Sequence, residues 1–189
     1  MLKRGWSRKE AEAVTPAQIK SMNARAKLRG LTVKSLLAVE DCETRIARDA
    51  RDARAHFDLA NHWHYLGRYA RALELYDEAV RLQPGASVIL CGRANLLATC
   101  PDAAFRNGAI ALKDALAALE IARVAGDLTT EWKLRQYVRA VACAHAELGD
   151  FDAAVRVLRE SLPMVVTHKG MRDFAGLLRR FEAHEAERN

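Results

Sequence analysis

Proline, glycine and aromatic residues are scarce in this sequence. Its 189 residues include four prolines and ten glycines, and aromatic side chains make up 6%. Runs of β-branched and aromatic residues, which mark β-strands, are missing, whereas the helix-favouring alanine, leucine and arginine dominate. Half of the residues are apolar and 29% are charged, as in folded rather than disordered chains. The composition therefore predicts an all-α domain with a sizeable core.

Long apolar runs are also missing. No stretch approaches the roughly 18 apolar residues of a membrane-spanning helix, and the charged N-terminal residues lack the apolar core of a secretory signal. The four cysteines are widely spaced and form no C-x-x-C motif: Cys42, Cys91, Cys100 and Cys143. We expect reduced, mostly buried thiols in a cytoplasmic protein that has no membrane partner.

Motifs that carry chemistry are lacking as well. The sequence has no G-x-S-x-G motif and no glycine-rich phosphate loop. His62 and His64 invite a metal interpretation, but residues two apart on a helix point about 200° away from each other. The isolated histidines at 145, 168 and 184 have no cysteine or carboxylate at ligand spacing. We therefore expect no enzymatic activity, no metal site and no cofactor.

The most regular unit runs from 53 to 86 and contains two helical patterns separated by the turn Leu66-Gly67-Arg68-Tyr69. Gly67 can adopt the left-handed conformation that ends the first helix, and Pro84 ends the second. Leu-Ala followed by an aromatic, then Leu-Gly-x-Tyr-x-x-Ala, Tyr-x-x-Ala and a closing proline, resembles the signature of the tetratricopeptide repeat (TPR). The resemblance implies an α-solenoid of stacked helical hairpins that binds other proteins.

A second unit of the same kind lies at 135–163, where Leu148-Gly149-Asp150-Phe151 parallels the first turn. The two turn glycines are separated by about 14 residues more than two repeats of roughly 34 would require. The intervening string LATCPDAAFRNG resembles a variant repeat of bacterial TPR proteins, in which a Pro-Asp loop replaces the tight turn. We therefore expect a long loop between a helix at 87–99 and a long helix at 109–124, and then an elongated helix at 129–148.

The remaining segments extend this pattern in both directions. Thr15-Pro16 is a good helix start, and helices are expected at 17–29 and 33–50. The inner stripe of the second of these helices is predicted to be Ala38, Cys42 and Ile46. A helix at 171–187 carries apolar residues on one face and would cap the open edge of the solenoid: Phe174, Leu177, Leu178 and Phe181. The predicted divisions are an arm (1–14) and a single domain (15–189), with a degenerate repeat (15–52), repeats at 53–86, 87–126 and 129–168, and a capping helix (169–188).

The resemblance also implies where a partner would bind, because in TPR arrays the first helix of each hairpin lines a concave groove. Groove positions at helical spacing are Phe57, Asn61, His64 and Tyr65 in the first unit, Val88, Cys91, Asn95 and Thr99 in the second, and Gln136, Arg139, Cys143 and Glu147 in the third. An asparagine can bind a peptide backbone through both donor and acceptor groups, and Arg139 adds a cation for a carboxylate. The predicted site for a protein or peptide partner is Phe57, Asn61, His64, Tyr65, Asn95 and Arg139. A polar wall without a specific ligand is the alternative.

TPR domains that clamp the C-terminal carboxylate of a chaperone use several basic residues and two asparagines. Phe57 stands here in place of one of these basic residues, and Gly92 replaces the second asparagine. A receptor for a chaperone tail is therefore not predicted.

Positive charge is concentrated at the N-terminus. Residues 1–34 hold nine Lys or Arg against two Glu, a net charge of +7, so the rest of the chain sums to −1. The basic arm, with Lys3, Arg4, Arg8 and Lys9, could bind nucleic acid, an acidic protein or an anionic membrane, or could only keep the terminus solvated. A nucleic-acid-associated protein whose repeats serve as a docking or dimerisation body is therefore the alternative function, although Trp6 is the one stacking aromatic there. A subunit buried within a larger complex is a third possibility.

Overall fold

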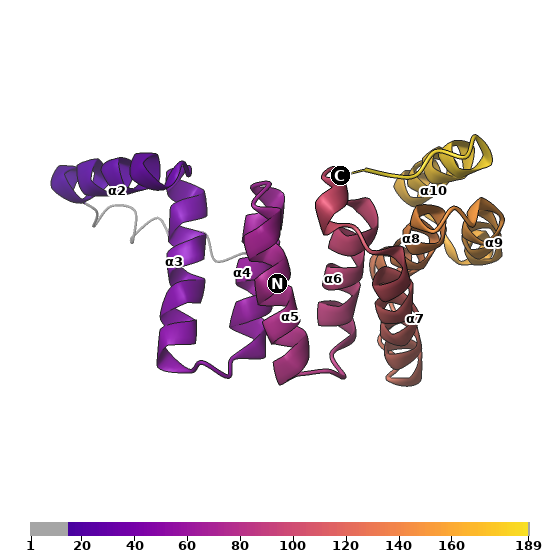
Figure 1. Cartoon of the computed structure of the whole chain (residues 1–189), viewed down its shortest axis with the longest axis horizontal. Coiled ribbons are helices and arrows are strands. Elements are labelled where there is room, and N and C mark those ends of the chain that lie inside the picture. The colour runs from indigo at the N-terminus through magenta and orange to yellow at the C-terminus, as the bar shows by residue number, and fades with distance from the viewer. Residues whose placement is uncertain (1–14, 189) are drawn as a thin grey trace.

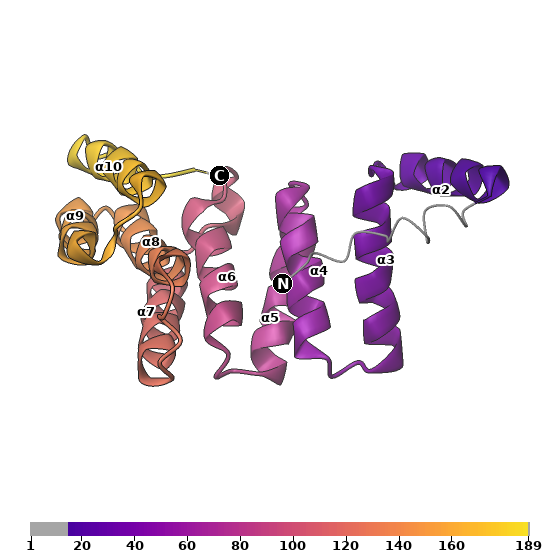
Figure 2. The same ribbon diagram turned by 180° about the vertical axis from the view of Figure 1, so that it is seen from behind.

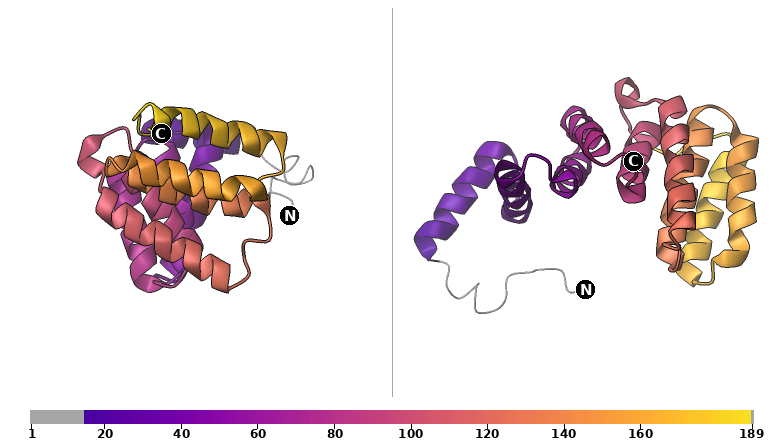
Figure 3. Two further views of the ribbon diagram at one scale, coloured as in Figure 1. Left: turned by 90° about the vertical axis from the view of Figure 1, so that its right-hand side faces the viewer. Right: turned by 90° about the horizontal axis from the view of Figure 1, so that it is seen from below.

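The computed structural model describes residues 15–188, and in this range the chain forms nine α-helices, two short 3-10 helices and no strand. The helices follow one another in a row that bends into an arc, as in an all-α solenoid (Figures 1 and 3). The elements are α2 (Pro16–Arg29), α3 (Val33–Arg48), α4 (Ala53–Tyr65), α5 (Tyr69–Leu82), α6 (Ser87–Thr99), η1 (Ala103–Phe105), α7 (Gly108–Val124), α8 (Glu131–Glu147), α9 (Phe151–Ser161), η2 (Leu162–Met164) and α10 (His168–Glu182). None of the described helices is both long and apolar enough to cross a lipid bilayer.

Three helical hairpins form the body: α4 with α5, α6 with α7, and α8 with α9. The tight turns of the first and third hairpins contain Gly67 and Gly149, whose φ angles of 71° and 80° are left-handed. The residue after each glycine donates its backbone N–H to the preceding helix, Arg68 to the carbonyl of Trp63 at 2.8 Å and Asp150 to that of His145 at 3.0 Å. Both repeats expected from the sequence pattern therefore close their first helix with a left-handed glycine.

The middle hairpin is joined by the expected longer loop, 100–107, which contains η1. Asn107 donates its backbone N–H to the carbonyl of Leu97 at 2.9 Å. Arg106 Nη1 donates to the carbonyl of Cys100 at 3.0 Å, and its Nε donates to Glu147 Oε1 on α8, also at 3.0 Å. The loop is therefore tied both to its own hairpin and to the next one.

The N-terminal end departs from a regular hairpin. Helix α2 lies across the end of α3 instead of running alongside it (Figures 1 and 2). Ion pairs join the two helices, Arg25 with Glu40 and Arg29 with Glu43.

The predicted inner stripe of α3 was wrong in part. The buried residues of α3 are Leu36, Val39 and Cys42, whereas Ala38 and Ile46 are half-buried. Ala38 lines a cavity beside α4, whereas Ile46, although half-buried, packs against the core that includes Val39 and Cys42.

The C-terminal end also differs from the prediction. Helix α10 buries Phe174, Leu177 and Phe181, but it ends at Glu182 rather than at 187. His184 adopts a left-handed φ of 58°, and the N–H of Glu185 donates to the carbonyl of Arg180 at 2.8 Å, which terminates the helix. The residues that follow turn back from α10 towards α6 (Figures 1 and 2). We call Ala183–Arg188 the C-terminal segment.

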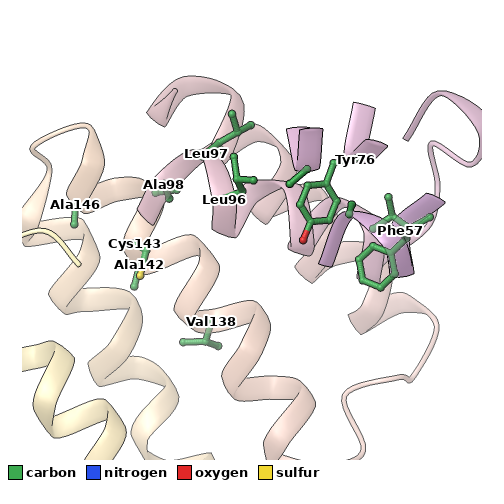
Figure 4. Packing of buried hydrophobic residues seen from close by; sticks show 14 of the residues in the cluster. Phe57, Tyr76, Leu96, Leu97, Ala98, Val138, Ala142, Cys143 and Ala146 are labelled. Carbon is green, nitrogen blue, oxygen red and sulfur yellow. The ribbon is translucent and has the colours of Figure 1, made fainter. Parts of the chain in front are cut away.

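The hydrophobic core runs through most of the helices and contains many alanines. Ala60, Ala72 and Ala79 are fully buried between α4 and α5, where small side chains let two helices approach closely. Phe57 and Tyr76 lie next to each other in this core, as Figure 4 shows, with ring centroids 6.1 Å apart. On α6, a Cβ at Gly92 would lie only 2.7 Å from the Phe57 ring, so glycine lets α6 pack directly on these aromatics.

Candidate partner-binding groove

Two cavities are lined in part by side chains of α4, α6 and α8, the first helices of the three hairpins. The N-terminal cavity, between α3 and α4, has a volume of about 920 Å³ and is lined by Val33, Lys34, Leu37, Ala38, Asp41, Cys42, Arg45, Asp58, Asn61 and His62. The C-terminal cavity, between α6, α8 and α10, has a volume of about 470 Å³ and is lined by Asn95, Trp132, Arg135, Gln136, Arg139, Arg172, Asp173, Phe174, Gly176, Leu177, Arg180 and Glu187.

The one arginine that lines the N-terminal cavity is paired with two nearby carboxylates. Arg45 donates to Asp52 through Nη2 and to Asp58 through Nη1, each at 3.1 Å. The hydrogen bond to Asp58 is the largest cause of the raised pKa of Arg45. Burial raises the pKa of the Cys42 thiol to about 11, so it stays protonated at neutral pH. Val33, Leu37 and Ala38 supply an aliphatic part of the lining, and Lys34 and Asp41 add one charge of each sign, so this cavity suits a partner surface that is partly apolar.

Asn61 and His64 meet at one buried hydroxyl. Tyr76 donates its hydroxyl to Asn61 Oδ1 at 2.7 Å, and His64 Nδ1 lies 3.5 Å from the same oxygen of Tyr76. Burial lowers the pKa of His64, and the positive charge of Arg139 lowers it further. Residues of the first and third hairpins therefore lie within electrostatic reach of each other.

Three predicted groove residues, Phe57, His64 and Tyr65, line neither cavity. Phe57 is 7% exposed, because its ring fills the space that Gly92 leaves on α6. It therefore belongs to the core instead of the predicted groove. Tyr65 is 89% exposed at the end of α4 and belongs to neither set of lining residues.

Asn95 and Arg139 come together in the C-terminal cavity. Arg139 Nη1 donates to Asn95 Oδ1 at 3.3 Å, and Asn95 Nδ2 donates to the carbonyl of Cys91 at 3.0 Å. Arg139 Nε also donates to Glu187 Oε2 at 3.0 Å. Burial, the largest influence, lowers the pKa of Arg139, but its interactions with Cys143 and Glu187 outweigh burial and leave that pKa raised.

The C-terminal segment lies on a stripe of α8 that the sequence had placed in the groove. Glu187 accepts a hydrogen bond from the thiol of Cys143 at 3.0 Å as well as from Arg139. Arg188 forms an ion pair with Glu147 at 3.0 Å. The three contacted residues are spaced four apart, so they lie along one face of the helix: Arg139, Cys143 and Glu147.

The main chain of the C-terminal segment is also held. Arg180 Nη2 donates to the carbonyl of Ala186 at 3.2 Å, and the side chain of Ala186 packs against the core. The sequence did not predict Glu187 or Arg188 as part of the site, because the helical pattern of α10 continues through them. The left-handed turn at His184, which has no glycine to mark it, carried no recognisable signal.

The C-terminal cavity has an excess of positive charge. Arg135, Arg139, Arg172 and Arg180 line it, against the carboxylates of Asp173 and Glu187. Arg135 pairs with Asp173, whereas Arg172 has no ion-pair partner among residues 15–188. Trp132 is 61% exposed at the edge and offers a flat apolar face. This arrangement suits a carboxylate next to an apolar group.

Comparison with known families agrees with the repeat pattern. Residues 53–86 match the family model of the tetratricopeptide repeat, over the same range as the unit formed by α4, α5 and the following turn. A comparison with curated proteins found no significant match. The chain therefore contains a tetratricopeptide repeat, a class of repeat that generally mediates protein–protein interaction. The basic residues Lys3, Arg4, Arg8 and Lys9 lie outside the described residues.

Proposed function

We propose that this protein is an adaptor that binds a segment of a partner protein along the two cavities. One observation carries the proposal: the stripe Arg139–Cys143–Glu147 on α8 already holds a non-helical segment of chain by side-chain contacts. A second cavity beside α4, the first helix of the matched repeat, extends the available surface.

The finer features of the proposal rest on the local structure. The loop at 100–107 supports the interpretation of 87–126 as a variant repeat of the bacterial type. The four free, buried cysteines support a reducing, cytoplasmic location. The protein acts by binding and has no catalytic activity of its own.

The test uses charge reversals that preserve the net charge. Lys34 and Asp41 are exposed and line the N-terminal cavity, so the variant Lys34→Glu/Asp41→Lys alters the groove without disturbing the core. Glu120 and Arg123 are exposed on α7 and line neither cavity, so Glu120→Lys/Arg123→Glu is the matched control.

Affinity purification from native lysate with quantitative mass spectrometry compares the two variants with the wild type, with and without nuclease. We expect the wild type and the control to retain the same partner proteins in equal amounts. Lys34→Glu/Asp41→Lys should retain these proteins at least about fivefold less, which corresponds to about 1 kcal/mol of binding free energy. Nuclease treatment should not change the amounts retained. Equal retention by both variants would place the interface elsewhere.

The nucleic-acid alternative has less support in the described part of the chain. Arg25 and Arg29 are engaged by Glu40 and Glu43 on α3, so part of the basic charge of 15–34 is neutralised. Loss of the retained proteins after nuclease treatment, in the wild type and both variants alike, would favour this alternative.

A further inference from the structure

The C-terminal segment is bound in the way that a separate peptide would be. Its main chain accepts a hydrogen bond from Arg180, the carboxylate of Glu187 is bound by Arg139 and Cys143, and the guanidinium of Arg188 lies against Glu147. These contacts come from α8 and α10 and involve both charges of the Glu187-Arg188 pair. We propose that Ala186–Arg188 is a tethered ligand of the C-terminal cavity, and that a partner protein displaces it with a segment of the same chemistry, a glutamate followed by a basic residue. This inference rests on the proposed adaptor function.

The charges of the cavity explain why a carboxylate is required. Four arginines face two carboxylates, and removing Glu187 leaves Asp173 as the one carboxylate in the lining. Arg139 is partly buried, with 32% of its side chain exposed, and displacement of Glu187 without a replacement carboxylate would increase the excess of positive charge in the cavity, which is unfavourable. A partner segment that displaces Glu187 must therefore bring its own acidic group.

The order of the two charges sets the direction of the ligand. Arg139 and Glu147 are eight residues apart, which is about 12 Å along a helix. Glu187 binds near the first and Arg188 near the second. A segment with the opposite order, basic before acidic, would place like charges together at both positions, which disfavours binding.

The attachment of the C-terminal segment allows displacement. Ala183, His184 and Glu185 are exposed, and Ala186 is the one residue of the segment that packs against the apolar core. The turn passes through His184, whose left-handed backbone is rarely adopted by residues other than glycine. Stacking of the His184 ring on Phe151, with centroids 5.1 Å apart, stabilises the turn. Glu187 and Arg188 are thus held by polar contacts, and a competing ligand can replace each of them.

The first experiment measures binding of a fluorescein-labelled peptide, AHEAERN, which has the sequence of residues 183–189. Fluorescence anisotropy compares the full-length wild type with the released variant Glu187→Gln/Arg188→Gln. The matched control is Glu185→Gln, which changes an exposed glutamate of the same segment that forms no ion pair among the described residues. A tethered ligand has an effective concentration of the order of millimolar, so we expect the released variant to bind the peptide at least about tenfold more tightly than the wild type.

Two further variants test the site itself. We expect Arg139→Gln in the released background to abolish binding, and the peptide AHEAQRN to bind at least about tenfold more weakly than AHEAERN. The control Glu185→Gln should bind the peptide as the wild type does. Equal affinity of the wild type and the released variant, or binding that survives Arg139→Gln, would overturn the proposal.

A second readout does not depend on the peptide. Cys143 lies directly against Glu187, so release of the segment should expose it to alkylation, whereas buried Cys100 serves as an internal reference. Mass spectrometry should show faster alkylation of Cys143 relative to Cys100 in the released variant, and added peptide should reverse it. An unchanged ratio in a variant that unfolds at the wild-type temperature would contradict the tethered ligand.

Failure of this proposal can be distinguished from failure of the adaptor proposal. If lysate proteins bind the released variant and the wild type equally but are lost from Lys34→Glu/Asp41→Lys, the tethered ligand is wrong and the adaptor function stands.

Discussion

The N-terminal and C-terminal cavities of the candidate groove differ in size, in lining and in whether a segment of the chain enters them. The N-terminal cavity is larger, its lining combines aliphatic residues with charges of both signs, and its arginine is paired with Asp58 of the lining and with nearby Asp52. The C-terminal cavity is smaller and rich in arginine, and a segment of the chain itself enters it. The N-terminal cavity therefore favours contact with apolar groups, whereas the C-terminal cavity favours a negatively charged group. A partner that spans both would carry an apolar stretch and an acidic residue.

On α6, a single arginine links the middle hairpin, α6 and α7, to the preceding hairpin, α4 and α5. Arg93 binds Asp114 on α7 through two hydrogen bonds, of 2.7 and 3.0 Å, and Asp77 on α5 through a third, of 2.8 Å. The carboxylate of Asp114 is buried, so it depends on this arginine for its charge balance.

The largest effect should come from breaking this junction. Arg93→Met leaves Asp114 buried without a counter-charge, and we expect a loss of about 3–5 kcal/mol in the free energy of unfolding. Urea denaturation followed by circular dichroism measures it. Arg81→Met, which removes an exposed pair with Glu78, should change little. A loss below about 1 kcal/mol for Arg93→Met would mean that Asp114 does not depend on Arg93 for its charge balance.

A steric change at the same junction should have the next largest effect. A Cβ at Gly92 would lie 2.7 Å from the Phe57 ring and 3.0 Å from the Tyr76 ring, so Gly92→Val forces α6 away from the first hairpin. We expect a loss of about 1–3 kcal/mol by urea denaturation. Gly176→Ala, on α10 with nothing within 4 Å of its Cβ position, is the control and should be neutral or slightly stabilising. Equal effects of the two substitutions would show that α6 is not closely packed.

A third substitution separates the role of Arg45 in the N-terminal cavity from that of Arg139 in the C-terminal cavity. Arg45→Gln removes the pairs with Asp52 and Asp58, and since Arg45 is partly exposed we expect a loss of no more than about 1 kcal/mol. Binding of AHEAERN in the released background should stay unchanged, in contrast to the loss expected for Arg139→Gln. Weakened peptide binding by Arg45→Gln would mean that the two cavities act as one site.

The smallest effect concerns pH. The pKa of His64 is lowered in the folded state, so below its ordinary value of 6.5 the unfolded state binds more protons. The free energy of unfolding should therefore fall as the pH drops from 7.5 to 5.5, and it should fall less in His64→Gln. Urea denaturation at three pH values gives both slopes. Identical slopes would show that His64 is solvated and lies outside the field of Arg139.

The parts of the fold that local pattern determines were predictable from the sequence. Left-handed glycines mark the turns at Gly67 and Gly149, and the Pro-Asp string marks the long loop. The burial of Phe57 was not predictable, because it depends on the absence of a side chain at Gly92 on another helix.

The candidate site was predictable to a similar extent. The spacing on α8 indicated that Arg139, Cys143 and Glu147 share one face of the helix. Their partners Glu187 and Arg188, however, lie on the segment that turns back after the C-terminal end of α10. That return depends on a left-handed histidine and on ion pairs between distant residues. Helical periodicity carries no information about either.

Glu147 joins three parts of the molecule, since it lies on α8 and pairs with Arg106 of the loop at 100–107 and with Arg188 of the C-terminal segment. In a repeat array each unit contacts only its neighbours, so local unfolding begins at whichever end is less tightly held. Here the C-terminal end is tied back to the middle, whereas α2 crosses the edge of α3 and buries little apart from Ala26. We therefore expect local unfolding to begin at α2, and we expect α6 to α10 to open together.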